Sequence, residues 1–138
     1  MGLKVWLPLN GDLRNQGCSV GNIVNYNATV YDYGKIGKCY SFNGSSYIDV
    51  GYGKDMSAKN LSIALWVKPL ASINNKIVMG VSNGTNQRFY LGGDSNAWEI
   101  GYGKYAWNNT SNAAYTLNTW QHLIVTVDEN GLATLYKN

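Results

Sequence analysis

The fold is decided by Trp120-Gln-His-Leu-Ile-Val-Thr-Val-Asp128, which Glu129-Asn-Gly131 joins to Leu132-Ala-Thr-Leu-Tyr-Lys137. Successive side chains of a strand point to opposite faces, so Leu123, Val125 and Val127 share one face. Asn130-Gly131 supplies the two positive-φ positions of a tight type I′ turn, which predicts a hairpin. One face of this strand is apolar and the other is half apolar, so we expect it to lie between packed layers.

The rest of the chain consists of short apolar or alternating runs that are separated by Gly, Asn, Asp, Ser and Pro. No segment shows a sustained helical period. Short strands with turn signals about every ten residues are typical of an all-β sandwich. We predict one antiparallel β-sandwich over residues 1–138. The expected strands are Leu3–Leu9, Ala28–Tyr33, Lys38–Phe42, Tyr47–Val50, Leu61–Lys68, Lys76–Val81, Arg88–Leu91 and Trp98–Tyr102. Residues 14–27 are interpreted as a loop with at most one short strand, because Ile23-Val24 is only a short apolar run.

Two local expectations concern how these strands are connected. Asn43-Gly-Ser-Ser46 separates Lys38–Phe42 from Tyr47–Val50, so we expect these two strands to pair as a second hairpin. Gly92-Gly-Asp94 follows the run Arg88–Leu91 and is interpreted as the turn that ends it.

Composition and charge exclude several classes of protein. The chain has 138 residues, of which 45% are hydrophobic and only 14% charged, and its net charge of +3 is not clustered. Nucleic-acid binding therefore has little support. No apolar run is long enough for a membrane span, and the N-terminus lacks the apolar core of a secretory signal. We expect synthesis in a cytoplasm, without a signal peptide.

Cysteine and metal chemistry are weakly represented. Cys18 and Cys39 do not make a disulfide framework, and without a secretory route we favour two free thiols. Together with the single histidine, His122, they make a poor zinc site. Calcium prefers several carboxylates, but Asp12, Asp49 and Asp94 are far apart in sequence, so calcium is unsupported. We predict no cofactor and no metal.

Four stretches together resemble the laminin-G-like, concanavalin A-like jelly roll, as found in bacteriophage structural proteins and bacterial surface proteins. They occur in the family's order over nearly the whole chain. The stretches are Pro8-Leu-Asn-Gly-Asp12, Gly34-Lys-Ile-Gly-Lys-Cys-Tyr-Ser-Phe-Asn-Gly-Ser-Ser-Tyr-Ile48, Leu61-Ser-Ile-Ala-Leu-Trp-Val-Lys-Pro69, and Trp120–Asp128 with Leu135-Tyr-Lys-Asn138. The resemblance implies a jelly-roll sandwich, a fold that hosts many functions.

The chain departs from the family's pattern in two places. Members often carry acidic residues in the loop that is Asn43–Ser46 here, and this loop has no carboxylate. The family also continues through several more strands, whereas this chain ends at Asn138 within an expected strand. We therefore expect the sandwich to be incomplete at its C-terminus, or completed by another chain. A bare edge beside Tyr136 would otherwise invite aggregation.

An enzyme of the glucanase type is our third hypothesis. Glycoside hydrolysis needs two carboxylates across the scissile bond. No Glu-x-Asp or Asp-x-Glu pair would place two on one strand face, and Glu99 and Glu129 are the only glutamates. For His122 we favour a packed core histidine over a catalytic base. We predict no catalytic residues.

The binding hypothesis is based on aromatic residues, because the chain has 11 Tyr and 5 Trp but only 2 Phe. Tyr and Trp join a flat apolar ring to a polar tip, which suits sugar faces and wet protein interfaces. The predicted ligand-binding residues lie on two expected strands and in the segment that follows them. They are Arg88, Tyr90, Trp98, Tyr102, Tyr105, Trp107, Asn108 and Asn109.

Some of these aromatics have an alternative role in packing. Trp98 and Tyr102 could instead fill the concave sheet of the sandwich, and for Trp98 we favour the core. Tyr105 and Trp107 have polar neighbours and suit an exposed position as well as a buried one. Trp66 and Trp120 belong to the strongest expected strands, so we expect both in the core.

The resemblance and the aromatics together suggest a non-catalytic carbohydrate-binding or adhesion module of a phage virion or cell-surface assembly. Its expected partners are glycans and other proteins of that assembly, and a chain that completes the sheet would make it an oligomer. Phage particles assemble in the host cytoplasm, which fits the expected free thiols. The alternative is a purely structural decoration or oligomerisation domain, whose aromatics face another protein.

Overall fold

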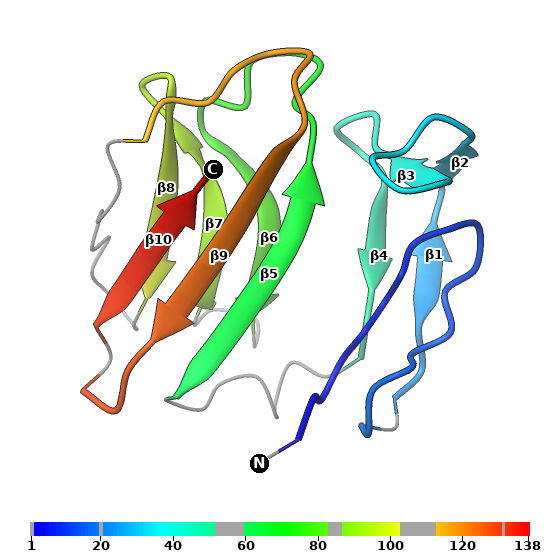
Figure 1. The fold of residues 1–138 in the computed structure, drawn as a ribbon, viewed down its shortest axis with the longest axis horizontal. Helices are drawn as coiled ribbons and strands as arrows, with labels where there is room; N and C mark the ends of the chain where they lie inside the picture. The colour runs from blue at the N-terminus through cyan, green and yellow to red at the C-terminus, as the bar shows by residue number, and fades with distance from the viewer. Residues whose placement is uncertain (1, 20, 52–59, 83–86, 103–112, 131) are drawn as a thin grey trace. The chain divides into compact units, whose positions relative to one another are not determined.

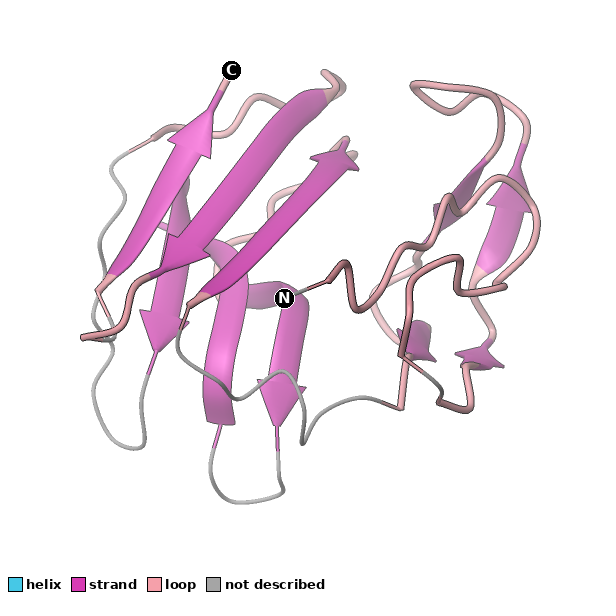
Figure 2. Ribbon diagram, turned by 60° about the horizontal axis from the view of Figure 1, so that its bottom comes forward, coloured by secondary structure: helices cyan, strands magenta, loops and turns pink. Residues whose placement is uncertain are grey.

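A computed structural model describes residues 2–19, 21–51, 60–82, 87–102, 113–130 and 132–138. The chain divides into two compact units, Met1–Tyr52 and Gly53–Asn138, which are considered separately below. Within the described ranges every regular element is a β-strand (Figure 2). No helix in this part of the chain has the length and apolarity needed to cross a membrane.

The first unit contains two short antiparallel ladders. Strand β1 (Val24–Tyr26) pairs with β4 (Tyr47–Asp49), and β2 (Thr29–Tyr31) pairs with β3 (Cys39–Ser41). Ala28 is the only buried hydrophobic residue among the described residues of this unit. Such short ladders, without a core of their own, contribute little independent stability.

Three expectations for the first unit are affected. Lys38–Phe42 and Tyr47–Val50 do not pair with each other, because their strands β3 and β4 join β2 and β1. Leu3–Leu9 forms no strand, although Leu3 and Lys4 carbonyls accept the Cys18 and Ser19 N–H groups. No disulfide joins Cys18 to Cys39.

The second unit is a sandwich of two antiparallel sheets (Figure 1). One sheet has the order β10-β9-β5 and the other the order β6-β7-β8. The strands of the first sheet are β5 (Leu61–Val67), β9 (Gln121–Val127) and β10 (Ala133–Lys137). The strands of the second are β6 (Lys76–Ser82), β7 (Gln87–Asp94) and β8 (Ala97–Tyr102).

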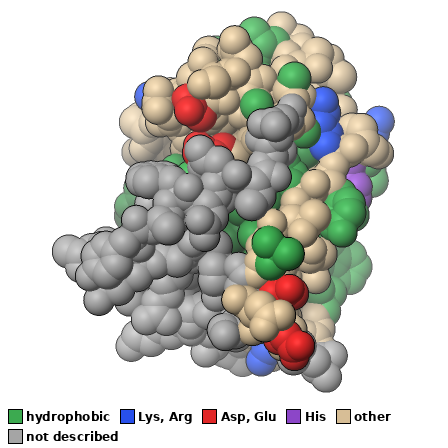
Figure 3. Space-filling model, turned by 90° about the vertical axis from the view of Figure 1, so that its left-hand side faces the viewer, with side chains coloured by type: hydrophobic (Ala, Val, Ile, Leu, Met, Phe, Trp, Pro, Cys, Tyr) green, Lys and Arg blue, Asp and Glu red, His purple; other side chains and the backbone are tan. Residues whose placement is uncertain are grey.

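Alternation along β5 and β9 sends residues to opposite faces of their sheet, as the sequence predicts. The outer face carries Trp66, which is 38% exposed, and its ring lies 4.9 Å from that of His122. The prediction that Trp66 is a core residue is therefore wrong, whereas His122 is half-buried and packs against Trp66 on this outer face. Figure 3 shows hydrophobic side chains beside the chain's single histidine at one edge of the view.

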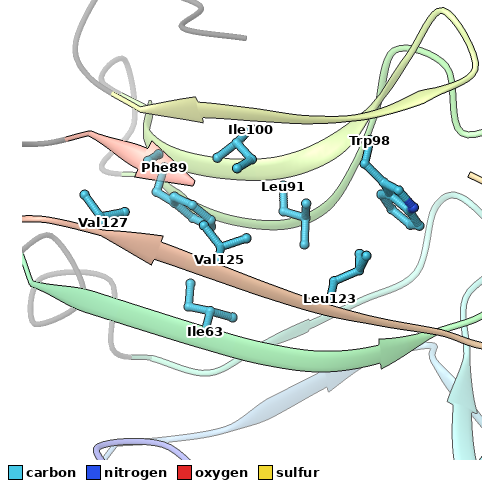
Figure 4. Close-up of a cluster of buried hydrophobic side chains, with 9 residues drawn as sticks. Ile63, Phe89, Leu91, Trp98, Ile100, Leu123, Val125 and Val127 are labelled. Atoms are coloured by element: carbon cyan, nitrogen blue, oxygen red, sulfur yellow. The ribbon is translucent and has the colours of Figure 1, made fainter. Parts of the chain in front are cut away.

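The core lies between the two sheets and takes residues from both (Figure 4). Phe89, Leu91, Trp98 and Ile100 of β7 and β8 face Ile63 of β5 and the alternate residues of β9. The buried β9 residues are Leu123, Val125 and Val127, each at most 2% exposed. The apolar face that the sequence predicts for β9, with Leu123, Val125 and Val127, is therefore the face that packs against the second sheet.

Two connections differ from the prediction. Ala133 pairs with Val127, so the ladder ends further from Asn130 than a two-residue turn allows, and Asn130 does not have the positive φ of a type I′ turn. The Asp128 carboxylate accepts N–H bonds from Asn130 and Leu132, each at 2.8 Å, and holds that wider loop. In addition, β7 continues through Gly92 and Gly93 to Asp94, whereas we expected a turn at these residues.

Candidate functional site

The two-residue turn between β7 and β8 is the centre of the candidate site. Asp94 pairs with Ala97, which leaves Ser95 and Asn96 as the whole turn. Their φ angles are 48° and 64°, the conformation of a type I′ hairpin turn. Asparagine tolerates this left-handed region better than most residues. The turn therefore holds Asn96 in a fixed position at one end of the sandwich.

Four polar side chains from three segments meet at this turn: Ser72, Asn74, Asn96 and Tyr115, which we call the polar end cluster. The Tyr115 hydroxyl donates to Asn74 Oδ1 at 2.8 Å and lies 3.1 Å from Ser72 Oγ. The Asn96 N–H donates to the same Asn74 oxygen at 3.0 Å. These bonds fix Asn74 and Tyr115 against the hairpin turn.

The side chain of Asn96 keeps much of its hydrogen-bonding capacity. Its Oδ1 makes only long contacts, 3.4 Å from the Tyr115 hydroxyl and 3.5 Å from Asn74 Nδ2. Its Nδ2 has no hydrogen bond to the described residues, and Asn96 is exposed. An amide offers two donors and one acceptor oxygen, so this group is available to a polar ligand.

The polar end cluster is supported by the core. The Tyr115 ring makes an edge contact with Trp98 at 5.9 Å. The buried Gln121 accepts the Trp98 indole N–H at 3.0 Å and donates to the Thr116 carbonyl at 2.9 Å. The segment that carries Tyr115 is thus anchored at its start and end, which pre-organises the cluster.

Two carboxylates lie on the outer face of the same hairpin. Glu99 pairs with Gly92, and Asp94 is two residues further along β7, so the two are diagonal neighbours on one face. The Cα atoms of such neighbours are about 7–8 Å apart in a sheet. Two carboxyl groups on one face are the residue types that a glycosidase uses as acid and base.

Tyr90 lies on the same face as these carboxylates, opposite Gly101. Tyr90 is only 5% exposed, and a Cβ at Gly101 would overlap its ring. Burial raises the pKa of the Tyr90 phenol well above its ordinary value, and the Glu99 and Asp94 carboxylates act in the same direction. Tyr90 is therefore a neutral phenol beside two acidic groups.

The predicted ligand-binding residues have different locations. Trp98 is fully buried in the core and offers no surface to a ligand, so its assignment as a ligand residue is replaced by the packing alternative. Arg88 and Tyr102 lie in β7 and β8, but their side chains are outside the described part. The segment 103–112 also lies outside it, with the predicted residues Tyr105, Trp107, Asn108 and Asn109. Their roles stay predictions.

Neither the polar end cluster nor the carboxylate pair was predicted from the sequence. Asn74 and Tyr115 are 41 residues apart and meet only through the fold. The carboxylates had a local signal, because a two-residue turn at Ser95-Asn96 places Asp94 diagonally across from Glu99. Interpreting Gly92-Gly-Asp94 as a loop concealed that signal.

The acidic residues considered for calcium are occupied locally or far apart in sequence. Asp12 pairs with Arg14 at 2.9 Å, and this neighbour lowers the pKa of the Asp12 carboxyl. Asp49 accepts the Gly51 N–H at 2.8 Å. The described residues contain no group of three or more His, Cys, Asp or Glu side chains that could hold a metal ion.

Comparison with known proteins gives one match. The family model described as the concanavalin A-like lectin/glucanases superfamily matches residues 42–138, which include both sheets of the sandwich. No curated protein and no solved structure matches the chain.

Proposed function

Because this chain belongs to the concanavalin A-like lectin/glucanase superfamily, we propose that it is a non-catalytic carbohydrate-binding module. We place its ligand site at the polar end cluster. One observation carries the proposal: the exposed Asn96 amide is held by a left-handed turn between Asn74 and Tyr115, with donors and an acceptor still available. The superfamily includes binding proteins and enzymes, so binding and catalysis must be distinguished by the chemistry of the site.

The chemistry of the cluster suits a neutral, hydroxyl-rich ligand. Each sugar hydroxyl is a donor and an acceptor, and amides and hydroxyls match both roles. Asn96 and Ser72 are exposed, and Tyr115 adds a phenol with an apolar ring. The four residues carry no charge, so the cluster does not favour an ionic ligand. Fixed side chains lose little entropy when they bind.

Asn96→Gly is the variant that tests this site. Glycine adopts positive φ readily, so the turn should persist while the amide is lost. Asn27→Gly is a matched control in the first unit, because Asn27 has a φ of 61°. We expect a polysaccharide panel, measured by calorimetry, to contain a ligand that binds wild type and Asn27→Gly but is weakened at least about tenfold by Asn96→Gly. Equal binding by all three would disprove the site.

The carboxylate pair supports a second candidate function, hydrolysis of a glycosidic bond. The favouring observation is the diagonal placement of Asp94 and Glu99 on one face. One carboxyl would protonate the leaving oxygen and the other would activate water. Release of reducing sugar that Glu99→Gln abolishes, while Glu129→Gln in the β9–β10 loop does not, would establish this function in place of simple binding. Glycan binding without product would exclude it.

The setting of the module is also part of the proposal. We infer that it works in a phage particle or at a cell surface, on the basis of its resemblance to structural and surface modules. The proposal predicts that peptides of this chain are found by mass spectrometry in purified particles or in the surface fraction of its source. Recovery from neither would contradict it.

A further inference from the structure

The chain contains four asparagines that are followed directly by glycine: Asn10, Asn43, Asn83 and Asn130. In such a pair the backbone nitrogen of the glycine can attack the side-chain carbonyl carbon of the asparagine, because glycine has no Cβ to obstruct the approach. The attack is intramolecular, so no enzyme is needed to bring the reacting groups together. The structure describes both residues of the first two pairs, and these differ in the surroundings of the asparagine side chain.

The carboxamide oxygen of Asn43 has three hydrogen-bond donors around it. The backbone N–H groups of Ser45 and Ser46 donate to Asn43 Oδ1 at 3.0 and 2.9 Å. The Ser45 hydroxyl donates to the same oxygen at 3.0 Å. Two backbone donors identify this atom as the oxygen, since an amide nitrogen could not accept them. All three donors belong to the short loop between β3 and β4, so they are made by one local stretch of chain.

Three donors match a tetrahedral oxyanion better than they match an amide. A planar amide oxygen has two lone pairs, whereas the oxyanion of a tetrahedral intermediate has three. Donors at about 2.7–3.1 Å from a developing oxyanion are the arrangement by which enzymes stabilise the intermediate of acyl transfer. The donors on Asn43 Oδ1 lie within this range. The loop is therefore suited to stabilise the oxyanion that forms when a nucleophile attacks Asn43 Cγ.

The nucleophile is the backbone nitrogen of Gly44. Its N–H donates no hydrogen bond to the residues that the structure describes, so no bond must break before it reacts. Gly44 has a φ of 91°, a conformation that residues with a side chain rarely adopt. The loop thus combines an available nucleophile with donors that polarise the carbonyl group beside it.

We propose that Asn43 is a self-modification site, at which the loop Asn43–Ser46 promotes closure of the Asn43 side chain onto the Gly44 nitrogen. A bond forms between Gly44 N and Asn43 Cγ, the Cγ–Nδ2 bond breaks, and ammonia leaves. The Gly44 proton passes to solvent, and the departing nitrogen takes a proton from solvent. Water then opens the cyclic imide to aspartate or isoaspartate at this position, so the net reaction is hydrolysis of an amide.

The product is also suited to this loop. A carboxylate accepts the same three donors, and hydrogen bonds to an ionised acceptor are stronger than those to an amide oxygen. Conversion adds one negative charge to a chain whose net charge is +3, so ion-exchange chromatography can separate the two forms. The site belongs to the first unit and is independent of the proposed carbohydrate site.

Peptide mapping of the aged full chain by mass spectrometry tests the proposal, with Asn10-Gly11 as a matched internal control. Gly11 also has a positive φ, 108°, but no donor binds the Asn10 side chain within the described residues. At mildly alkaline pH we expect Asn43 to convert at least about tenfold faster than Asn10 in the folded chain, and at a similar rate in urea. Equal rates in the folded chain, or a difference that persists unchanged in urea, would overturn the proposal.

Ser45→Ala tests the role of the donors. It removes the hydroxyl donor but keeps the backbone N–H, so Asn43 should convert about two- to tenfold more slowly. Ser45→Thr retains a hydroxyl and should retain the rate, and Asn10 should convert equally in all three proteins. Circular dichroism verifies that each variant is folded. An unchanged Asn43 rate in Ser45→Ala, or faster conversion, would overturn the proposal.

Discussion

The indole N–H of Trp98 donates to Gln121 Oε1 at 3.0 Å, and both side chains are buried. This bond joins β8 to the first residue of β9. Gln121 also holds the Thr116 carbonyl, while the Trp98 ring supports Tyr115. Trp98, which the sequence favours as a core residue, is therefore buried and supports the polar end cluster without itself contacting a ligand.

The Trp98–Gln121 bond predicts a measurable coupling. Trp98→Phe and Gln121→Leu should each destabilise the sandwich by about 1–3 kcal/mol. Trp98→Phe leaves Gln121 Oε1 with only the longer bond from the Thr116 N–H, at 3.3 Å, and Gln121→Leu leaves the buried indole N–H unpaired. The double variant should cost less than the sum by at least about 0.5 kcal/mol. Urea unfolding followed by circular dichroism measures all three. Strict additivity would show that the bond contributes nothing.

Core packing predicts that truncating two different leucines has very different effects on the free energy of unfolding. Leu123 is fully buried between the sheets, so Leu123→Ala should cost about 2–5 kcal/mol of unfolding free energy. Leu132 is 61% exposed in the β9–β10 loop, so Leu132→Ala should change stability by less than about 0.5 kcal/mol. Similar losses from both variants would show that β9 is not the centre of the core.

Because the Tyr90 phenol is buried, we expect the folded state to lose stability at alkaline pH. Its pKa in the folded protein is raised above the ordinary value of 10.0, so the folded state resists ionisation that the unfolded state allows. The contribution is complete below pH 10 and is lost as the pH rises above it. Tyr90→Phe should flatten the decline of stability between about pH 10 and 11. Parallel declines in wild type and Tyr90→Phe would contradict the burial of this phenol.

The turn at Ser95-Asn96 predicts that two substitutions differ in stability. Alanine at φ 64° should cost roughly 1–2 kcal/mol, whereas glycine adopts this angle without strain. Asn96→Ala should therefore lower the unfolding temperature more than Asn96→Gly. If both variants unfold at the same temperature, the left-handed geometry is not what holds Asn96 in place.

Much of the sandwich could be predicted because β5 and β9 alternate without interruption, and alternation directly reports a half-buried strand. Glycines were harder to interpret. Strand β7 needs a glycine at position 93, because the Ile73 side chain approaches the backbone there too closely for a Cβ. In the sequence alone, a glycine required by such a close approach resembles a glycine of a turn. Pairing in the first unit was also misjudged, because a turn closed by the Gly34 N–H and the Gly37 carbonyl joins β2 to β3.

The candidate site could be predicted only in part. Aromatic richness drew attention to β7 and β8, where Tyr90 and the β7–β8 hairpin are found, but it could not show that Trp98 faces inward. The polar end cluster depends on contacts between residues 19 to 43 positions apart, such as Tyr115 with Asn96 and with Ser72. No local pattern encodes such contacts, since they follow from how the two sheets pack.

Nuclear magnetic resonance of the ¹⁵N-labelled chain, titrated with neutral oligosaccharides, measures carbohydrate binding at the polar end cluster residue by residue. We expect one glycan to shift the Asn96 side-chain amide and the Tyr115 backbone signals in a saturable way. Asn96→Gly should remove this response, while Asn27→Gly should retain it. A panel that shifts no signal, or shifts signals only away from the polar end cluster, would contradict carbohydrate binding at this site.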